Sequence, residues 1–327
     1  MNILITGGAG FIGSHLSERL VLLGHKVVVL DNLSTGRISN LDTLSDPKNF
    51  QFVQGSILDV GLLNQLVAES NYVFHLAAAV GVFNIVSHPL ESLLTNIRGT
   101  ENVLEAALIN KTPVFLSSSS EVYGKNTSDS LKEEDDRVIG SPMKLRWSYS
   151  EAKAIDESLA YAYFTEKQLE TRTVRFFNTV GPRQVGAYGM VVPRFVRSAL
   201  MDEPLTIYGN GTQTRCFAHV YDVVDAITAV AFAPNTIGKI VNVGNDYEIS
   251  IDDLALKIIQ ETNSASKIVK LSYKEAYGEG FEDMQRRVPN LDLIEKLVGW
   301  KPRRDLTTMI NDISLEMTSE IKAKSLQ

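Results

Sequence analysis

The fold of this chain is decided by the stretch Gly7-Gly8-Ala9-Gly10-Phe11-Ile12-Gly13, which has the spacing G-x-x-G-x-x-G. The run Asn2–Thr6 before it reads as a short buried strand, and a helical pattern follows over 10–23. Glycine keeps the turn between them tight and lets a phosphate approach the backbone without a Cβ in the way. The start of the helix then offers N–H groups to that phosphate. Because glycine turns also occur without any ligand, this motif needs support from the rest of the chain.

Strand and helix patterns alternate through the first half of the chain. Short β-branched runs separated by longer helical runs are typical of βαβ units, which build a parallel sheet covered on both faces. We therefore predict an α/β fold with a Rossmann-like doubly wound sheet, in which residues 1–180 bind a dinucleotide. The strands are expected at 2–6, 26–31, 50–54, 72–76, 114–117 and 171–176, and the helices at 10–23, 60–69, 90–110 and 148–167.

The second half of the chain has longer loops, rich in Gly and Pro, within 178–289. Helical patterns are expected near 192–201, 220–233 and 251–262. We predict that residues 181–327 form mainly a smaller C-terminal α/β lobe for substrate, with some segments returning to the sheet. The polar tail from Ser314 is expected to be a poorly ordered end.

Composition excludes several classes of protein. Of 327 residues, 44% are hydrophobic and 22% are charged, as in an ordinary globular protein rather than a disordered chain. The net charge of −7 argues against binding to nucleic acid or to anionic membranes. No apolar run is long enough to span a bilayer. The single cysteine, Cys216, excludes an internal disulfide and a cysteine-built metal site, so we expect a cytoplasmic protein without a metal.

A carboxylate at the end of the second predicted strand supports the glycine turn. Asp31 follows Gly13 by 18 residues, where an acidic side chain accepts from the ribose hydroxyls of a dinucleotide. Its charge repels a 2′-phosphate, so we predict NAD rather than NADP, although Arg37 lies nearby. The residues expected to contact NAD are Gly7, Gly10, Phe11, Ile12, Gly13, Asp31, Asn32, Ser34, Thr35, Gly36, Ile57, Asp59, Leu76, Ala77, Ala78, Asn96, Tyr149 and Lys153.

Two polar residues near this site leave alternatives open. Asp59 follows the third predicted strand, and it either bonds the adenine amino group or caps the next helix. His75 precedes the small residues Ala77 and Ala78, over which the cofactor can lie. We predict that His75 is a packed structural histidine rather than a catalyst.

The chemistry is predicted from Tyr149 and Lys153, which stand four apart and therefore share one helical face. An ammonium beside a phenol favours the phenolate, so we expect Lys153 to lower the pKa of Tyr149 and make it a base for a substrate hydroxyl. The serine run before Glu121 ends a predicted strand, and Ser119 is expected to bond the same substrate oxygen. The alternative is an exposed Tyr and Lys that share this spacing by chance.

These motifs in combination resemble the extended short-chain dehydrogenase/reductase family, the nucleotide-sugar epimerases, dehydratases and decarboxylases. The resemblance covers essentially the whole chain, and it also rests on the segments 96–100, 175–183, 204–209, 213–217 and 286–289. It implies an enzyme with a tightly held NAD and a UDP-sugar or similar nucleoside-diphosphate sugar as substrate. It also implies a homodimer, with a four-helix contact formed by 90–110 and 148–167 of each subunit.

The resemblance further implies which residues face the sugar nucleotide. Asn178, Arg215 and Arg287 supply an amide and two guanidiniums, and arginine suits a diphosphate because its planar donors bind two oxygens at once. The alternative for the two arginines is surface solvation. The segment 189–197 is expected to pass near the nucleoside. The predicted substrate-binding residues are Ser119, Glu121, Asn178, Val191, Arg194, Tyr208, Arg215 and Arg287.

Members of this family share a first step, which the resemblance extends to this chain. Tyr149 removes the C4 hydroxyl proton, and hydride passes from C4 to NAD. The 4-keto sugar then follows one of three routes. An epimerase returns hydride to the other face, and a dehydratase removes water across C5 and C6. A decarboxylase loses carbon dioxide from a C6 carboxylate, because the neighbouring ketone accepts the electrons.

Glu121 separates these three reactions. C4-epimerases usually carry a small or hydroxyl residue there and 4,6-dehydratases carry Asp-Glu, whereas Ser120-Glu121 resembles the UDP-glucuronate decarboxylases. The stretches 146–149 and 280–287 resemble the same group, in which the arginine matching Arg287 acts at C5 and C6. We therefore favour UDP-glucuronate decarboxylation to a UDP-pentose, a lyase reaction. The alternatives are UDP-glucose or UDP-glucuronate C4-epimerisation, an isomerase reaction, then 4,6-dehydration and a non-catalytic NAD sensor. The predicted catalytic residues are Tyr149, Lys153, Ser119, Glu121 and Arg287.

One electrostatic conflict follows from this prediction. An ionised Glu121 would repel the carboxylate of a bound glucuronate. The conflict is tolerable if burial protonates Glu121, or if the repulsion weakens once carbon dioxide leaves. The other interpretation is a structural carboxylate that bonds the backbone or Tyr123.

Overall fold

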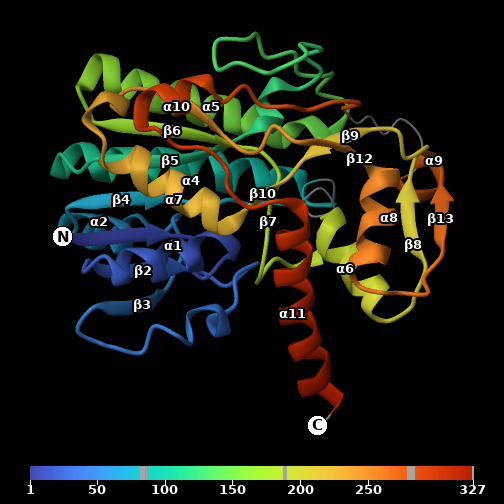
Figure 1. Ribbon diagram of the computed structural model, residues 1–327. Coiled ribbons are helices and arrows are strands. Elements are labelled where there is room, and N and C mark those ends of the chain that lie inside the picture. The colour runs from blue at the N-terminus through green and yellow to red at the C-terminus, as the bar shows by residue number, and fades with distance from the viewer. Residues whose placement is uncertain (82–84, 86, 187–189, 278–283, 326–327) are drawn as a thin grey trace.

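Seven parallel strands form the central sheet of the computed structural model, in the order β11-β6-β5-β4-β1-β2-β3 (Figure 1). The structure describes residues 1–81, 85, 87–186, 190–277 and 284–325. The strand order reverses between β1 and β4, which is where open parallel sheets bind ligands. The strands of the sheet are β1 (Asn2–Thr6), β2 (Lys26–Asp31), β3 (Phe50–Gln54), β4 (Tyr72–His75), β5 (Val114–Ser119), β6 (Thr171–Phe176) and β11 (Ile240–Val243).

Helices cover both faces of this sheet, because its strands are apolar on both sides. In β1, Ile3 and Ile5 pack into one hydrophobic core and Leu4 packs into the other, as the alternation of side chains along a strand requires. The first core is completed by α1 (Phe11–Leu22), α7 (Val220–Phe232) and α10 (Asp292–Val298). The second is completed by α2 (Val60–Ala68), α4 (Pro89–Asn110) and α5 (Ser148–Lys167).

A separate hydrophobic core lies in the second half of the chain, at the right of Figure 1. It is built by α6 (Val191–Leu200), β8 (Leu205–Tyr208), α8 (Ile251–Glu261) and α11 (Leu306–Ser325). Three two-stranded sheets accompany it, and they pair β10 with β7, β12 with β9 and β13 with β8. The remaining elements are β7 (Thr179–Val180), β9 (Thr214–Cys216), β10 (Ala218–His219), β12 (Glu248–Ser250), β13 (Ile268–Leu271), α9 (Tyr273–Tyr277), and the 3-10 turns η1 (Ile38–Leu41), η2 (Ser120–Tyr123), η3 (Leu145–Trp147) and η5 (Pro234–Thr236).

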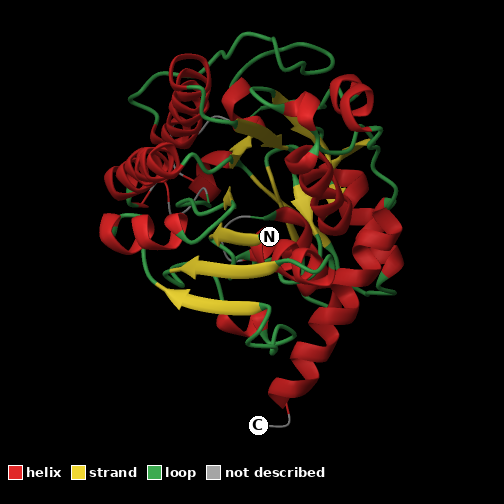
Figure 2. Cartoon of the chain, turned by 90° about the vertical axis from the view of Figure 1, so that its left-hand side faces the viewer, coloured by secondary structure: helices red, strands yellow, loops and turns green. Residues whose placement is uncertain are grey.

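The predicted α/β class, doubly wound order and helix-covered sheet are confirmed. Every predicted strand and helix is present, with its ends shifted by two residues at most. β11, from the second half of the chain, pairs with β6 in the central sheet. The expectation of a poorly ordered tail from Ser314 is wrong for the described residues, which continue α11. Ile310, Ile313 and Met317 hold this helix against the separate core, although its end projects from the body (Figures 1 and 2).

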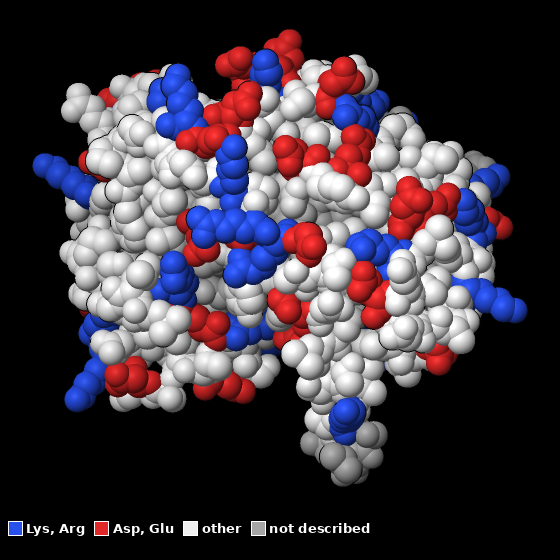
Figure 3. All heavy atoms as spheres, in the orientation of Figure 1, with Lys and Arg blue, Asp and Glu red and all other residues white. Residues whose placement is uncertain are grey.

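The surface carries mixed charge on the face seen in Figure 3, where small groups of Lys and Arg are interspersed with Asp and Glu. A continuous basic stripe, which is the footprint of nucleic-acid binding, does not cross this face. Among the described helices, none combines the length and the apolar character that crossing a membrane requires.

Candidate active site

A cavity of about 600 Å³ opens at the carboxyl ends of the parallel strands. The glycine turn after β1, Asp31 at the end of β2 and the serines at the end of β5 line one part of it. Residues of α6, together with Arg215 and Arg287, line the other part. The cavity therefore spans the sheet and the separate C-terminal core, at the place where a doubly wound sheet binds its ligand.

The glycine turn is shaped by close backbone contacts that exclude a side chain. Gly7 has a φ of +74°, and a Cβ there would lie 2.6 Å from the backbone N of Ala77. A Cβ on Gly13 would lie 2.2 Å from the carbonyl oxygen of Gly7. Gly10 is the N-cap residue of α1 and makes no side-chain hydrogen bond to the helix. The free backbone N–H groups and the positive end of the helix dipole therefore face the cavity. A pyrophosphate fits this cradle.

The first prediction concerns this cradle. Substituting Gly13→Ala is expected to abolish NAD binding and to lower the free energy of unfolding by about 1–3 kcal/mol, because the new Cβ meets backbone atoms that cannot move aside. Calorimetric titration with NAD and thermal unfolding measure the two effects. Gly61→Ala in α2 is the control, since its Cβ comes no closer than 3.5 Å to the Asp59 carboxylate. Unchanged NAD affinity in the Gly13 variant would contradict the assignment.

Asp31 ties the glycine turn to the loop after β2. Its Oδ2 accepts from the backbone N of Ala9 at 3.0 Å, and its Oδ1 accepts from the backbone N of Leu33 at 2.8 Å. Burial raises the pKa of Asp31, and these two hydrogen bonds partly offset the rise. Arg37 is exposed and is not one of the described cavity-lining residues. The arrangement suits ribose hydroxyls better than a 2′-phosphate.

Most residues predicted to contact NAD lie on the cavity wall, but four do not. Gly36 lies beneath the glycine turn, where an added Cβ would come within 3.0 Å of the carbonyl oxygen of Ala9. The other three predicted NAD contacts that do not line the cavity are Asn96, Asp59 and Lys153. The residues on the wall are Gly7, Gly10, Phe11, Ile12, Gly13, Asp31, Asn32, Ser34, Thr35, Ile57, Leu76, Ala77, Ala78 and Tyr149.

Asn96 and Asp59 have structural partners. The Asn96 side chain bonds both the backbone N and the carbonyl oxygen of Ala79, at 2.7 and 3.2 Å, and so holds the loop after β4. Asp59 is exposed and caps α2 by accepting from the backbone N of Leu62 at 3.1 Å. The structure thus shows the helix-cap alternative for Asp59, while Asn96 supports the cavity wall from behind.

His75 is a structural histidine, as predicted. Its two ring nitrogens contact the hydroxyls of Thr6 and Thr100 at 2.8 and 3.1 Å inside the protein. Burial and the nearby charge of Lys153 lower the pKa of His75 to about 3, so the ring is neutral at physiological pH.

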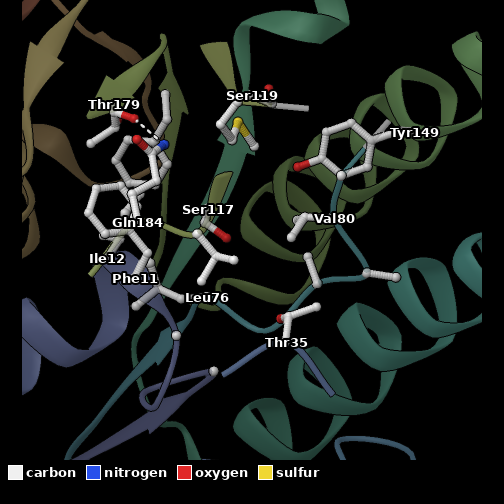
Figure 4. Close-up of a pocket in the computed structure, with 18 of the residues that line it drawn as sticks. Phe11, Ile12, Thr35, Leu76, Val80, Ser117, Ser119, Tyr149, Thr179 and Gln184 are labelled. Carbon is white, nitrogen blue, oxygen red and sulfur yellow. Dashed lines mark hydrogen bonds between the residues drawn. The ribbon is translucent and has the colours of Figure 1, made fainter. Parts of the chain in front are cut away.

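The hydroxyl of Tyr149 points from α5 into the cavity, across from Phe11 and Ile12 (Figure 4). Ser119, at the end of β5, acts through its hydroxyl to lower the pKa of this phenol. Burial and the carboxylates of Glu121 and Asp156 outweigh that effect, so the pKa of Tyr149 is raised. Tyr149 and Ser119 are therefore brought together, but the surroundings of the phenol favour its protonated form.

The predicted effect of Lys153 on Tyr149 is wrong for this structure. The two residues share a helical face, but the Lys153 ammonium donates to the carbonyl oxygen of Ser117 at 3.0 Å and pairs with Asp156 at 3.2 Å. Both members of the ion pair are buried. Because Asp156 neutralises the ammonium, Lys153 leaves the pKa of Tyr149 high.

Glu121 is held between two guanidiniums. Its Oε2 accepts from Nη1 of Arg146 at 2.7 Å, and its Oε1 accepts from Nη1 of Arg287. Burial alone would raise the pKa of Glu121, but the two arginines hold it well below its usual range. The idea that burial protonates Glu121 is therefore wrong. Its side chain bonds arginines, and not the backbone or Tyr123 as the structural interpretation proposed.

The residues predicted for the sugar nucleotide converge on the same cavity. Arg215 and Arg287 are each only 7% exposed, which excludes the surface interpretation. Nη2 of Arg287 lies 3.4 Å from Oδ1 of Asn178, and the Arg194 guanidinium stacks 4.3 Å over the Tyr208 ring. Val191 also lines the cavity. Residues 187–189 and 278–283 lie outside the described residues, so the predictions for 189 and 280–283 fall outside them as well.

Several cavity residues were not predicted from the sequence. Arg146 lies on the cavity wall, and its position in the sequence three residues before Tyr149 is the signal that points to the site. Gln184 lines the cavity and donates to the carbonyl oxygen of Thr179 at 2.8 Å (Figure 4). Asp156 is fully buried and is not among the described cavity-lining residues; it was not predicted either, because its effect depends on the ion pair with Lys153.

This sheet, its glycine turn, and a Tyr and a Lys on one helix beside it define the class of short-chain dehydrogenase/reductase folds. The family described as GDP-mannose 4,6 dehydratase matches residues 4–313. The chain therefore belongs to this family of extended short-chain dehydrogenases/reductases.

Individual relatives are similar over nearly the whole chain. UDP-N-acetyl-alpha-D-glucosaminuronate decarboxylase of Bacillus cytotoxicus is 42% identical over 300 residues, 91% of this chain and 92% of that protein. UDP-glucuronic acid decarboxylase 1 of Xenopus tropicalis is 38% identical over 92% of this chain and 68% of that protein. The solved UDP-glucuronic acid 4-epimerase of Bacillus cereus, in complex with UDP-glucuronic acid and NAD, has a TM-score of 0.88 and 27% identity, and the match covers 98% of this chain and 100% of that one.

Proposed function

We propose that this protein is an NAD-dependent UDP-uronate decarboxylase that converts UDP-glucuronate into a UDP-pentose and carbon dioxide. The observation that carries the proposal is the ionised Glu121 held by Arg146 and Arg287 on the cavity wall. The names of the relatives support it, since UDP-glucuronic acid decarboxylases and a decarboxylase of the 2-acetamido analogue are similar over most of the chain.

The cofactor fits the cradle at the sheet. The glycine turn would hold its pyrophosphate, Asp31 its adenosine ribose, and Leu76 to Ala78 the path towards the nicotinamide. When bound, NAD would accept a hydride from the sugar C4 and return it later. Its positive nicotinamide ring would also favour the ionised form of Tyr149.

Tyr149, Ser119 and Lys153 are proposed to act on the C4 oxygen. The Tyr149 phenolate takes the proton of the C4 hydroxyl, while the Ser119 hydroxyl donates to the same oxygen and keeps it in place. Lys153 contributes by its position, since its ammonium is fixed by the carbonyl oxygen of Ser117 and by Asp156. Tyr149 gives the proton back when C4 is reduced again.

Decarboxylation follows from the ketone at C4. The C5–C6 bond breaks, carbon dioxide leaves, and the bonding electrons pass through C5 to the C4 oxygen as an enolate. A proton then returns to C5. Arg287 is proposed to bind the carboxylate before this step and to stabilise the negative charge during it, because its guanidinium is buried on the cavity wall.

The second prediction tests the reaction itself. Purified protein given NAD and UDP-glucuronate is expected to release carbon dioxide and form a UDP-pentose, detected by trapping the gas and by chromatography. UDP-N-acetylglucosaminuronate run in parallel shows which group at C2 is preferred. The similarity to a UDP-glucuronic acid 4-epimerase supports the alternative. Formation of the 4-epimer without carbon dioxide would establish that reaction instead.

We also propose that residues 1–180 bind NAD, that 181–327 mainly bind the sugar nucleotide, and that the enzyme is a cytoplasmic homodimer. α4 and α5 pack together and expose apolar side chains, among them Leu90, Leu94 and Ile155 at 69%, 36% and 43%. Such a face suits a contact with the same helices of a second subunit. A monomer in sedimentation experiments at micromolar concentration would contradict the homodimer.

A further inference from the structure

Arg146 is fixed beside the catalytic helix by its neighbours. It lies in η3, directly before α5, and its guanidinium stacks 4.7 Å from the ring centre of Trp147, which is completely buried. The Arg146 side chain is 8% exposed, and Nη1 donates to Oε2 of Glu121 at 2.7 Å. The stacking and the ion pair together hold this cation on the cavity wall.

The two arginines around Glu121 differ in what else they touch. Arg287 also approaches Ser120 Oγ at 3.5 Å and Asn178 Oδ1 at 3.4 Å. These long contacts leave Arg287 able to bond an incoming ligand. Arg146, by contrast, is tied to Trp147 and to one oxygen of Glu121.

A count of charges shows why two arginines are present. Glu121, Arg146 and Arg287 together carry one net positive charge on the wall of the cavity. A ligand carboxylate beside them makes two carboxylates and two guanidiniums, which is balanced. Without Arg146, the same ligand would have to compete with Glu121 for the single guanidinium of Arg287, and one negative charge would stay uncompensated in a largely buried site.

We propose that Arg146 is a positioning residue for acidic sugars: it keeps Glu121 bound as a carboxylate, so that Arg287 is released to the C6 carboxylate of the substrate. This rests on the proposed function, because it requires a uronate as substrate. It removes the conflict between Glu121 and the substrate carboxylate, since the charge that separates them comes from Arg146. Arg146 acts through Glu121 and Arg287 and is not itself required to touch the sugar.

The experiment compares an acidic with a neutral ligand. In NAD-saturated protein carrying Tyr149→Phe, which strongly slows turnover, the dissociation constants of UDP-glucuronate and UDP-glucose are measured by calorimetry. Arg146→Met keeps an unbranched apolar side chain and removes the charge, and it is expected to reduce the preference for UDP-glucuronate by about tenfold or more. Binding of UDP-glucose is expected to change less than threefold, as an order-of-magnitude bound on a neutral ligand.

A conservative variant and a matched control distinguish a positioning role of Arg146 from a general effect on the stability of the protein. Arg146→Lys keeps the positive charge and is expected to restore most of the preference. Arg172→Met is the control, because this arginine is also buried, at 6% side-chain exposure, but pairs with Glu170 and Thr236 instead of Glu121. If Arg146→Met does not fold, Arg146→Gln takes its place and is expected to lose the same preference.

Each outcome decides one of the two proposals. An unchanged preference in folded Arg146→Met or Arg146→Gln would overturn the role of Arg146, as would an equal loss in Arg172→Met. Failure of Arg146→Lys to restore the preference would also count against it. The proposed function is judged separately, by the unsubstituted enzyme. If that enzyme releases carbon dioxide but the variants keep the preference for UDP-glucuronate, only the role of Arg146 is rejected. If it releases no carbon dioxide, the decarboxylase function is rejected.

Discussion

Replacement of Tyr149 by Phe is expected to lower kcat by about 10²–10⁴-fold, the usual contribution of a general base, while the protein stays folded and binds NAD. The substitution removes one oxygen and keeps the ring at its half-buried place in the cavity wall. The C4 hydroxyl then has no group to take its proton. Carbon dioxide release measures the loss, and NAD titration with thermal unfolding shows that the fold and the cofactor site are kept.

Tyr123→Phe is the matched control for this variant. Tyr123 is a buried tyrosine, and its hydroxyl donates to Oδ1 of Asn242 at 2.8 Å, outside the cavity. The control is expected to lose about 1 kcal/mol of stability and to keep its activity. Substantial activity in Tyr149→Phe would remove this residue from the role of base, and equal losses in both variants would point to a general effect on the fold.

The local part of the fold could be predicted well from the sequence. The glycine turn and the helix α5 are defined by residues that are neighbours along the chain, and α5 begins and ends where the pattern places it. β11 was not predicted as a strand, because its pairing with β6 joins segments far apart in the sequence. α11 was missed for a related reason: the polar residues after Ser314 indicate a tail, while Ile313 and Met317 pack against helices that precede them by many residues.

The part of the site that could be predicted consists of residues that act directly on the ligand and do not depend on other side chains. The glycines and Asp31 act on a dinucleotide directly, so their spacing is informative. The ionisation of Glu121 depends on Arg146 and Arg287, which are 25 and 166 residues away. The pKa of Tyr149 depends in turn on the carboxylates of Glu121 and Asp156. Such electrostatic balances are set by tertiary contacts, and a helical spacing alone gave the wrong direction for the pKa of Tyr149.

Arg287→Gln is expected to reduce carbon dioxide release by about 10²–10³-fold, the effect of removing one donor from a site where negative charge develops. The substitution removes the guanidinium that bonds Glu121 and approaches Asn178, and it leaves Glu121 paired with Arg146 alone. The free energy of unfolding is expected to fall by about 1–3 kcal/mol, because one buried acceptor loses a charged partner. Arg287→Lys keeps the charge but not the planar pair of donors, so we expect only a partial recovery.

The neighbouring arginine provides the control for this last variant. Arg286 is 41% exposed and pairs with Glu248 at 2.8 Å, away from the described cavity residues. Arg286→Gln is therefore expected to change stability by less than about 1 kcal/mol and to leave carbon dioxide release intact. If Arg287→Gln released carbon dioxide at the rate of the Arg286 variant, Arg287 would have no role at C5 and C6. If it also lost binding of the neutral UDP-glucose, the guanidinium would act on a part that both ligands share and not on the C6 carboxylate, because the two ligands differ only at C6.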